Sequence, residues 1–74
     1  MTINNEKFVH FDETSNRDVV IAEIFVDTAD ELPEINGISG KLLHQGSSAL
    51  IAKEGRIAVL SGDGHWYVNR EMIK

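Results

Sequence analysis

Cysteine is absent from this chain of 74 residues, which excludes disulfide bonds and thiolate metal sites. Basic residues are also few, with seven Lys and Arg against twelve Asp and Glu and a formal charge of −5. Proteins that bind nucleic acids usually carry a basic face, because neutralising phosphates supplies most of their affinity. The composition therefore argues against direct binding of DNA or RNA.

Long apolar runs are missing as well, since no stretch approaches the roughly 20 residues of a membrane-spanning helix. The first six residues, MTINNE, lack the basic and apolar segments of a signal peptide. We therefore expect a cytoplasmic protein that has no contact with a membrane.

What remains is one small domain of ordinary globular composition, with 42% hydrophobic and 26% charged residues. A domain of this size buries little more apolar area than it needs to offset conformational entropy. Without disulfides or a metal, self-association or docking on a larger partner is the remaining common source of stability.

The apolar segment 19–26, VVIAEIFV, is the strongest strand prediction, because it is rich in β-branched residues. A short buried helix is the alternative, since periodicity does not separate the two in brief apolar runs. Ahead of it, 7–11 predicts a short strand and 12–18 a polar turn. Segment 1–18 is thus an N-terminal strand and loop.

Segment 27–40 is an acidic turn and loop. Thr28 and Glu31 have the spacing of a capping box, and Pro33 limits any helix near 28–32 to about one turn. The oxygen-bearing side chains lack the regular alternate spacing of a calcium loop.

Segment 41–69 predicts an antiparallel β-meander. Leu42 and Leu43 begin it, 48–53 and 56–61 form a hairpin around Glu54 and Gly55, and a Gly-Asp-Gly turn leads to 65–68. Alternation places Ile57, Val59, Trp66 and Val68 on one face, and Ala58, Leu60, His65 and Tyr67 on the other. The predicted fold class is mainly β, a small meander of five to six short strands.

The sequence predicts no catalytic, cofactor-binding or metal-binding residues. The pairs His10–Asp12 and Asp63–His65 each supply only two ligands, and His44 has no such neighbour. Ser47, Ser48 and Ser61 lie outside any nucleophile-elbow motif. We therefore expect no enzymatic activity.

Seven of the eight residues in 19–26 are apolar, more than one small domain is expected to cover on both faces. A second copy related by a two-fold axis would provide that cover. The candidate interface residues are Val20, Ile24 and Phe25, together with Tyr67 and Arg70, because aromatic and Arg side chains are enriched at interfaces.

Segments 30–33, 46–50, 55–60 and 64–67, read as DELP, GSSAL, GRIAVL and GHWY, form a series that resembles short modules of bacteriophage and prophage virion proteins. Head-fibre, tail and baseplate accessory proteins are the types it is most similar to. The resemblance spans 27–68, leaves out 1–26, and departs at Ala58, where such modules often carry an aromatic residue.

This resemblance implies a structural role, no enzymatic activity, and assembly with itself or with other virion proteins. It adds the virion as a destination after the cytoplasm. The alternative function from composition alone is a small acidic protein-binding module recruited to a cellular partner.

Overall fold

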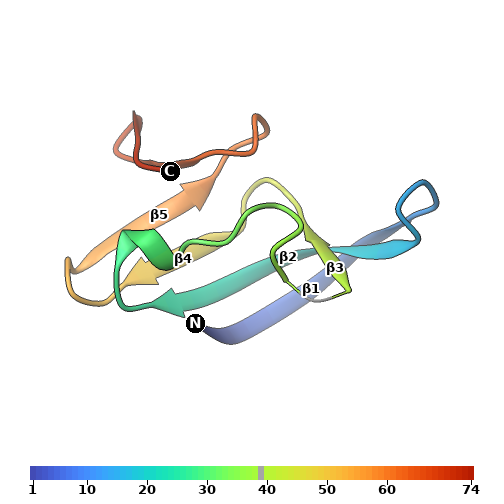
Figure 1. Cartoon of the computed structure of the whole chain (residues 1–74), viewed down its shortest axis with the longest axis horizontal. Helices are drawn as coiled ribbons and strands as arrows, with labels where there is room; N and C mark the ends of the chain where they lie inside the picture. Colours follow the sequence, from blue (N-terminus) through green and yellow to red (C-terminus); the bar gives the residue numbers. More distant parts are fainter. Residues whose placement is uncertain (39) are drawn as a thin grey trace.

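The computed structural model describes residues 1–38 and 40–74 and contains seven β-strands and one 3₁₀ turn (Figure 1). The elements are β1 (Thr2–Asp12), β2 (Arg17–Val26), η1 (Ala29–Glu31), β3 (Lys41–Leu43), β4 (Ser48–Ile51), β5 (Arg56–Leu60), β6 (Trp66–Val68) and β7 (Glu71–Met72). The predicted mainly β class is confirmed, and the described part of the chain has one strand more than the five to six expected, the short C-terminal β7. No helix in the described part of the chain is long and apolar enough to cross a membrane.

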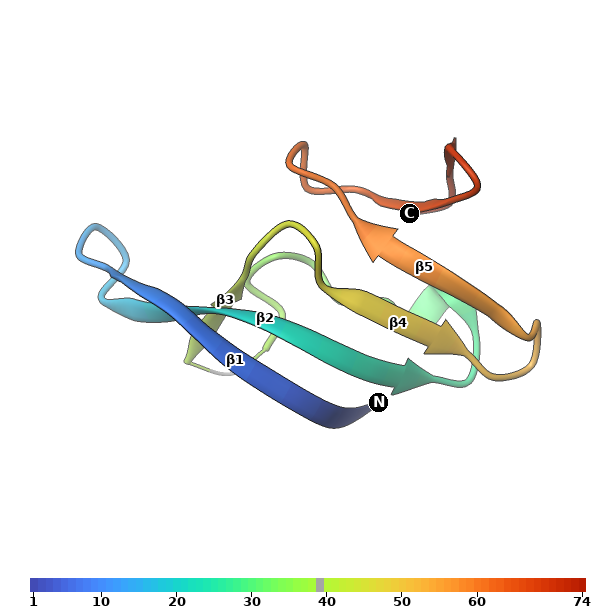
Figure 2. The same cartoon turned by 180° about the vertical axis from the view of Figure 1, so that it is seen from behind.

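All seven strands belong to one sheet, in the order β1-β2-β4-β5-β6-β7, with β3 beside the first half of β2 (Figure 2). Most neighbours are antiparallel, as a meander requires. The exception is β2, which pairs in parallel with both β3 and β4. Parallel neighbours need a crossover between them, and residues 27–38 and 40 belong to it.

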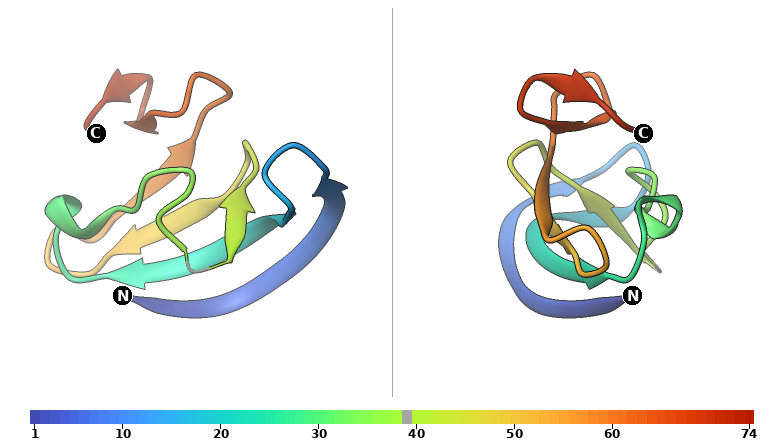
Figure 3. Two further views of the ribbon diagram at one scale, coloured as in Figure 1. Left: turned by 45° about the vertical axis from the view of Figure 1, so that its right-hand side comes forward. Right: turned by 90° about the vertical axis from the view of Figure 1, so that its left-hand side faces the viewer.

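The N-terminal hairpin joins β1 and β2, the two longest strands. At its turn the Asp12 carboxylate accepts hydrogen bonds from the Ser15 amide and hydroxyl, at 3.0 and 2.6 Å, and Asn16 has a φ of 59°. The pairing shifts register twice along β1, between Ile3 and Asn5 and between Phe8 and His10. These bulges bend β1, which curves strongly in Figure 3.

The crossover begins with the predicted capping segment. The Glu31 carboxylate accepts from the Thr28 and Asp27 amides at 3.3 and 3.2 Å, and the single turn of η1 ends at Glu31, with Leu32 as its C-cap before Pro33. Leu32 and Ile38 are buried against the sheet. Trp66 of β6 also links the sheet to the crossover, because its indole Nε1 donates a hydrogen bond to the Pro33 carbonyl at 2.8 Å. The crossover therefore covers one face of the sheet.

Buried Ser47 holds together the interruption between β3 and β4. Its hydroxyl accepts from the Ala22 amide at 3.1 Å and donates to the His44 carbonyl at 2.9 Å. The chain leaves β2 after His44, whose amide donates to the Val20 carbonyl, and rejoins it at Ser48. A serine side chain thus takes the place that a backbone carbonyl has in an unbroken ladder.

The core lies on the inner face of the curled sheet, between the strands and the crossover (Figure 3). It is built from alternate residues of the central strands, with Trp66 the largest: Val20, Ala22, Ile24, Val26, Leu43, Ala49, Ile51, Ala58, Leu60, Trp66 and Val68. The opposite face of β2 carries Glu23 and Phe25, both exposed. The chain therefore covers the inner face of β2, whereas its outer face is exposed at Glu23 and Phe25, half-buried at Ile21 and buried at Val19.

The predicted faces of the C-terminal meander were wrong. Trp66 and Val68 share the inner face with Ala58 and Leu60, whereas Tyr67 shares the outer face with Ile57 and Val59. The reason is the connection 61–65, whose five residues place Leu60 opposite Trp66 and Val59 opposite Tyr67. A change of one residue in that register exchanges the faces of β6.

Candidate interaction surfaces

An apolar patch lies on the outer face of the sheet, where β2, β4 and β5 run side by side. Phe25, Leu50 and Ile57 are direct cross-strand neighbours in one row, and Val59 is the next outer residue on β5. Their exposed fractions are 44%, 38%, 62% and 46%. We call these four residues the outer patch. If a fully exposed large side chain has roughly 150–250 Å² of surface, the exposed fractions of the four residues together amount to about 350 Å² of mostly apolar surface.

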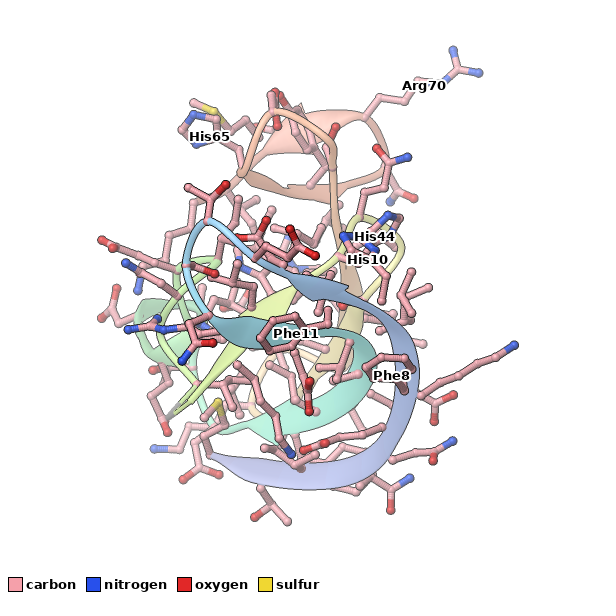
Figure 4. All side chains as sticks on the ribbon, turned by 90° about the vertical axis from the view of Figure 1, so that its right-hand side faces the viewer. Phe8, His10, Phe11, His44, His65 and Arg70 are labelled. Atoms are coloured by element: carbon pink, nitrogen blue, oxygen red, sulfur yellow. The ribbon has the colours of Figure 1, made fainter. Side chains whose placement is uncertain are left out.

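A second apolar patch lies on β1 near the hairpin turn, and we call its residues Phe8, Val9 and Phe11 the hairpin patch. Their exposed fractions are 60%, 37% and 47%, which corresponds to about 250 Å² on the same scale. Phe8 and Phe11 stand opposite Val20 and Asp18, on the inner side of the sheet, beyond the crossover that covers the core. Figure 4 looks at this end of the molecule and shows both aromatic rings there.

The two patches are separated along the sheet and lie on opposite faces. Thr2 pairs with Phe25 of the outer patch, and Phe8 lies six residue steps further along the extended strand, about 20 Å away. Figure 1 accordingly shows the β4–β5 turn and the β1–β2 turn at opposite ends of the long axis. One planar contact cannot cover both patches of a single copy.

Tyr67 and Arg70 lie beside the outer patch. They line a shallow hollow with Val59, Ser61 and Asn69. The Tyr67 hydroxyl donates to Asp63 Oδ2 at 2.5 Å, and this hydrogen bond raises the pKa of Tyr67 and lowers the pKa of Asp63. The Asp63 carboxylate also accepts from the His65 amide at 3.0 Å.

Arg70 occupies the tip of the β6–β7 hairpin, and its side chain extends away from the body of the molecule (Figure 4). Asn69 and Arg70 both have positive φ, 49° and 70°, as the two central residues of a type I′ turn do. Glycine usually takes the second of these positions, because a side chain there is strained. Arg70 therefore stands in solvent at a position where its backbone conformation is unfavourable.

The structure divides the five candidate interface residues into two groups. Val20 and Ile24 are 4% and 2% exposed in the chain's own core, so a partner could contact them only if the sheet opened. Phe25, Tyr67 and Arg70 all face the outer side of the sheet or its edge. These three residues therefore remain the candidate interface residues that a partner can reach. Phe8 and Phe11 were not among the predicted interface residues. Two aromatic residues three positions apart in an expected strand do not indicate that their side chains are exposed.

His44, His65 and Ser47 each have a side-chain atom within hydrogen-bonding distance of a backbone carbonyl. Among residues 1–38 and 40–74, no three His, Cys, Asp or Glu side chains gather closely enough to hold a metal ion. His65 Nδ1 lies 3.1 Å from the Lys74 carbonyl, and His44 Nδ1 lies 2.8 Å from the Gln45 carbonyl. Ser47 is committed to two hydrogen bonds in the core, so its hydroxyl has a structural role.

Comparisons with known proteins found no matching family model, no similar curated protein and no similar solved structure.

Proposed function

We propose that this chain is a structural assembly protein of phage or prophage origin that acts by associating with copies of itself and with other virion proteins. The observation that carries the proposal is the outer patch, which combines four large apolar side chains on adjacent strands. Soluble monomers generally keep contiguous exposed apolar patches to a few hundred Å², and patches at that limit are often interaction sites.

The size of the patch fits this role. An interface of standard size buries about 800 Å² on each partner, and a little more than half of that area is apolar. The outer patch supplies about 350 Å² of it, and Tyr67 and Arg70 at its border add the aromatic and guanidinium groups that are enriched at interfaces. The resemblance of 27–68 to virion modules supports the same role. Three of the four outer-patch residues, Leu50, Ile57 and Val59, lie inside that span, and Phe25 lies just before it.

The test is the molar mass in solution, measured by light scattering on size-exclusion chromatography from about 10 µM to 1 mM. We expect the wild type to form oligomers in this range. Ile57→Lys should lower the apparent association constant at least about 10-fold, because it buries an unpaired charge in the contact. Met72→Lys is the matched control, since Met72 is similarly exposed, at 56%, on β7 and outside both patches.

A wild type that stays monomeric and folded at 1 mM would contradict self-assembly. The alternative would then be a small acidic binding module, which the net charge of −5 favours. The proposed origin is tested separately by the genomic neighbourhood, where capsid, portal or tail genes are expected.

A further inference from the structure

The two apolar patches of this chain raise the question of how copies are arranged. If two copies met through their outer patches about a two-fold axis, both hairpin patches would stay exposed. If they met through their hairpin patches, both outer patches would stay exposed. A contact between the hairpin patch of one copy and the outer patch of the next buries both kinds at once. Together they offer about 600 Å² of mostly apolar surface, close to the roughly 680 Å² of apolar area in a contact of about 1,200 Å², the small end of the standard size.

Charge distinguishes the two arrangements. Beside the hairpin patch, the turn residues 12–18 hold three acids, Asp12, Glu13 and Asp18, against Arg17, a net charge of −2. Beside the outer patch, the β4–β5 turn and the first residue of β5 hold Lys53 and Arg56 against Glu54, a net charge of +1, and the exposed Glu23 and Arg70 at the border of the patch balance each other. Glu54 and Arg56 form an ion pair, and Lys53 is exposed. A contact between unlike patches brings the acidic turn toward the basic one, whereas like patches bring equal charges together.

Direct pairing of two β1 edges is the competing arrangement, because the outer edge of β1 has no strand partner in the described part of the chain. Two features of β1 oppose it. Its two bulges interrupt the row of outward-facing amides and carbonyls, and Lys7 lies near the middle of the strand, so that pairing centred there opposes two ammonium groups. Natural edge strands use the same features to prevent pairing.

We propose that copies of this chain associate head to tail, with Phe8 and Phe11 of one copy packed on the outer patch around Ile57 of the next. This inference rests on the proposed self-assembly and specifies its contact. The two patches lie about 20 Å apart along a molecule 36 Å long and on opposite faces of its sheet, so each copy can use both at the same time. The contact is heterologous, and assemblies therefore grow beyond dimers into rings or filaments.

The test mixes two variants that each lack one half of the contact. The hairpin variant carries Phe8→Ser and Phe11→Ser, and the face variant carries Ile57→Lys. We expect each variant to be monomeric alone at concentrations where the wild type forms a distribution of oligomers. A 1:1 mixture should form a heterodimer and nothing larger, because the face variant supplies its hairpin patch and the hairpin variant supplies its outer patch.

The alternative outcomes are distinct. A hairpin variant that still dimerises alone would overturn the head-to-tail contact and leave self-assembly through the outer patch standing. A wild type that is monomeric at 1 mM would contradict both. Far-UV circular dichroism and thermal melting confirm that each variant is folded.

A dilution series of the wild type followed by amide NMR needs no variant. Head-to-tail association predicts that resonances of 8–11 and of 50–59 shift with one common midpoint. Shifts confined to either region would overturn the proposal.

Discussion

Strands β1 and β2 are neighbours of nearly equal length with opposite environments. All but the last of the 11 residues of β1 are exposed, whereas β2 buries Val19, Val20, Ala22, Ile24 and Val26. Both carry large apolar side chains, and β1 has Ile3, Phe8, Val9 and Phe11. The difference comes from position, because β2 has strands on both sides and the crossover above it, while β1 has one neighbour and little cover. The apolar residues of an edge strand are therefore free for contacts outside the chain.

The largest expected effect comes from truncating equivalent inner-face residues on the two strands. Ile24→Ala should lower the free energy of unfolding by about 2–4 kcal/mol, because it leaves a cavity in the core. Phe8→Ala should change it by no more than about 0.5 kcal/mol in the monomer, because the ring is 60% exposed. Urea denaturation at low protein concentration measures both. Equal losses would show that Phe8 is covered within its own chain.

The next effect concerns the amides of β2. Ser47→Ala removes the acceptor of the buried Ala22 amide and should cost about 1–3 kcal/mol, the penalty of an unsatisfied buried donor. Ser48→Ala is the control, because Ser48 is half-buried and pairs with Glu23 on the outer face. The same urea titration measures both, and a loss below about 0.5 kcal/mol for Ser47→Ala would mean that water replaces the hydroxyl.

Hydrogen exchange of the backbone amides of β1 should show, residue by residue, which amides face the unpaired outer edge of the sheet. The Val20 and Val26 carbonyls and the Ala22 amide of β2 point to the β3–β4 side, so its odd-numbered residues bond to β1. Lys7 stands opposite Ile21, whereas Glu6 and Phe8 stand opposite Ala22 and Val20. The Glu6 and Phe8 amides should therefore exchange at least about 10-fold faster than that of Lys7. Measured on the monomeric face variant, uniform protection along β1 would contradict a free edge.

The smallest effect lies near the opposite edge of the sheet, at Tyr67 and Asp63. The hydrogen bond lowers the pKa of Asp63, so the stability it contributes is present above about pH 4 and is lost as pH falls below it. The same bond raises the pKa of Tyr67, so its contribution is present below about pH 10 and is lost above it.

Tyr67→Phe should therefore lower the melting temperature slightly at pH 7 and by less at pH 2.5. Because both groups are exposed, the change at pH 7 should be about a degree. A difference between wild type and variant that stays constant from pH 2.5 to pH 7 would contradict a role for the ionised Asp63.

Much of the fold was predictable from local patterns, and the failures have physical causes. The β-branched residues of 19–26 and the Gly-containing turns located β2, β4, β5 and β6 correctly. The first five residues of β1, TINNE, show no alternation, so its length was missed. The parallel pairing of β2 depends on the path of residues 27–40, which no local pattern records. Among the candidate surface residues, Phe25 was named from the sequence and is exposed, and its place at an interface stays a prediction, whereas the exposure of Phe8 depends on which strand lies at the edge.

The parallel pairing of β2 with β4 also affects the order in which the chain folds. Glu23 reaches Ser48 only after 24 intervening residues have closed into a loop, whereas Ile51 and Arg56 of the β4–β5 hairpin are separated by four. Loop closure costs more entropy as the loop lengthens, and non-local pairing slows folding. We therefore expect the two hairpins to form early and independently, and their union along β2 to limit the rate. Until that step, the apolar inner face of β2 is uncovered. A newly synthesised chain is therefore most prone to non-native association with other chains during this interval.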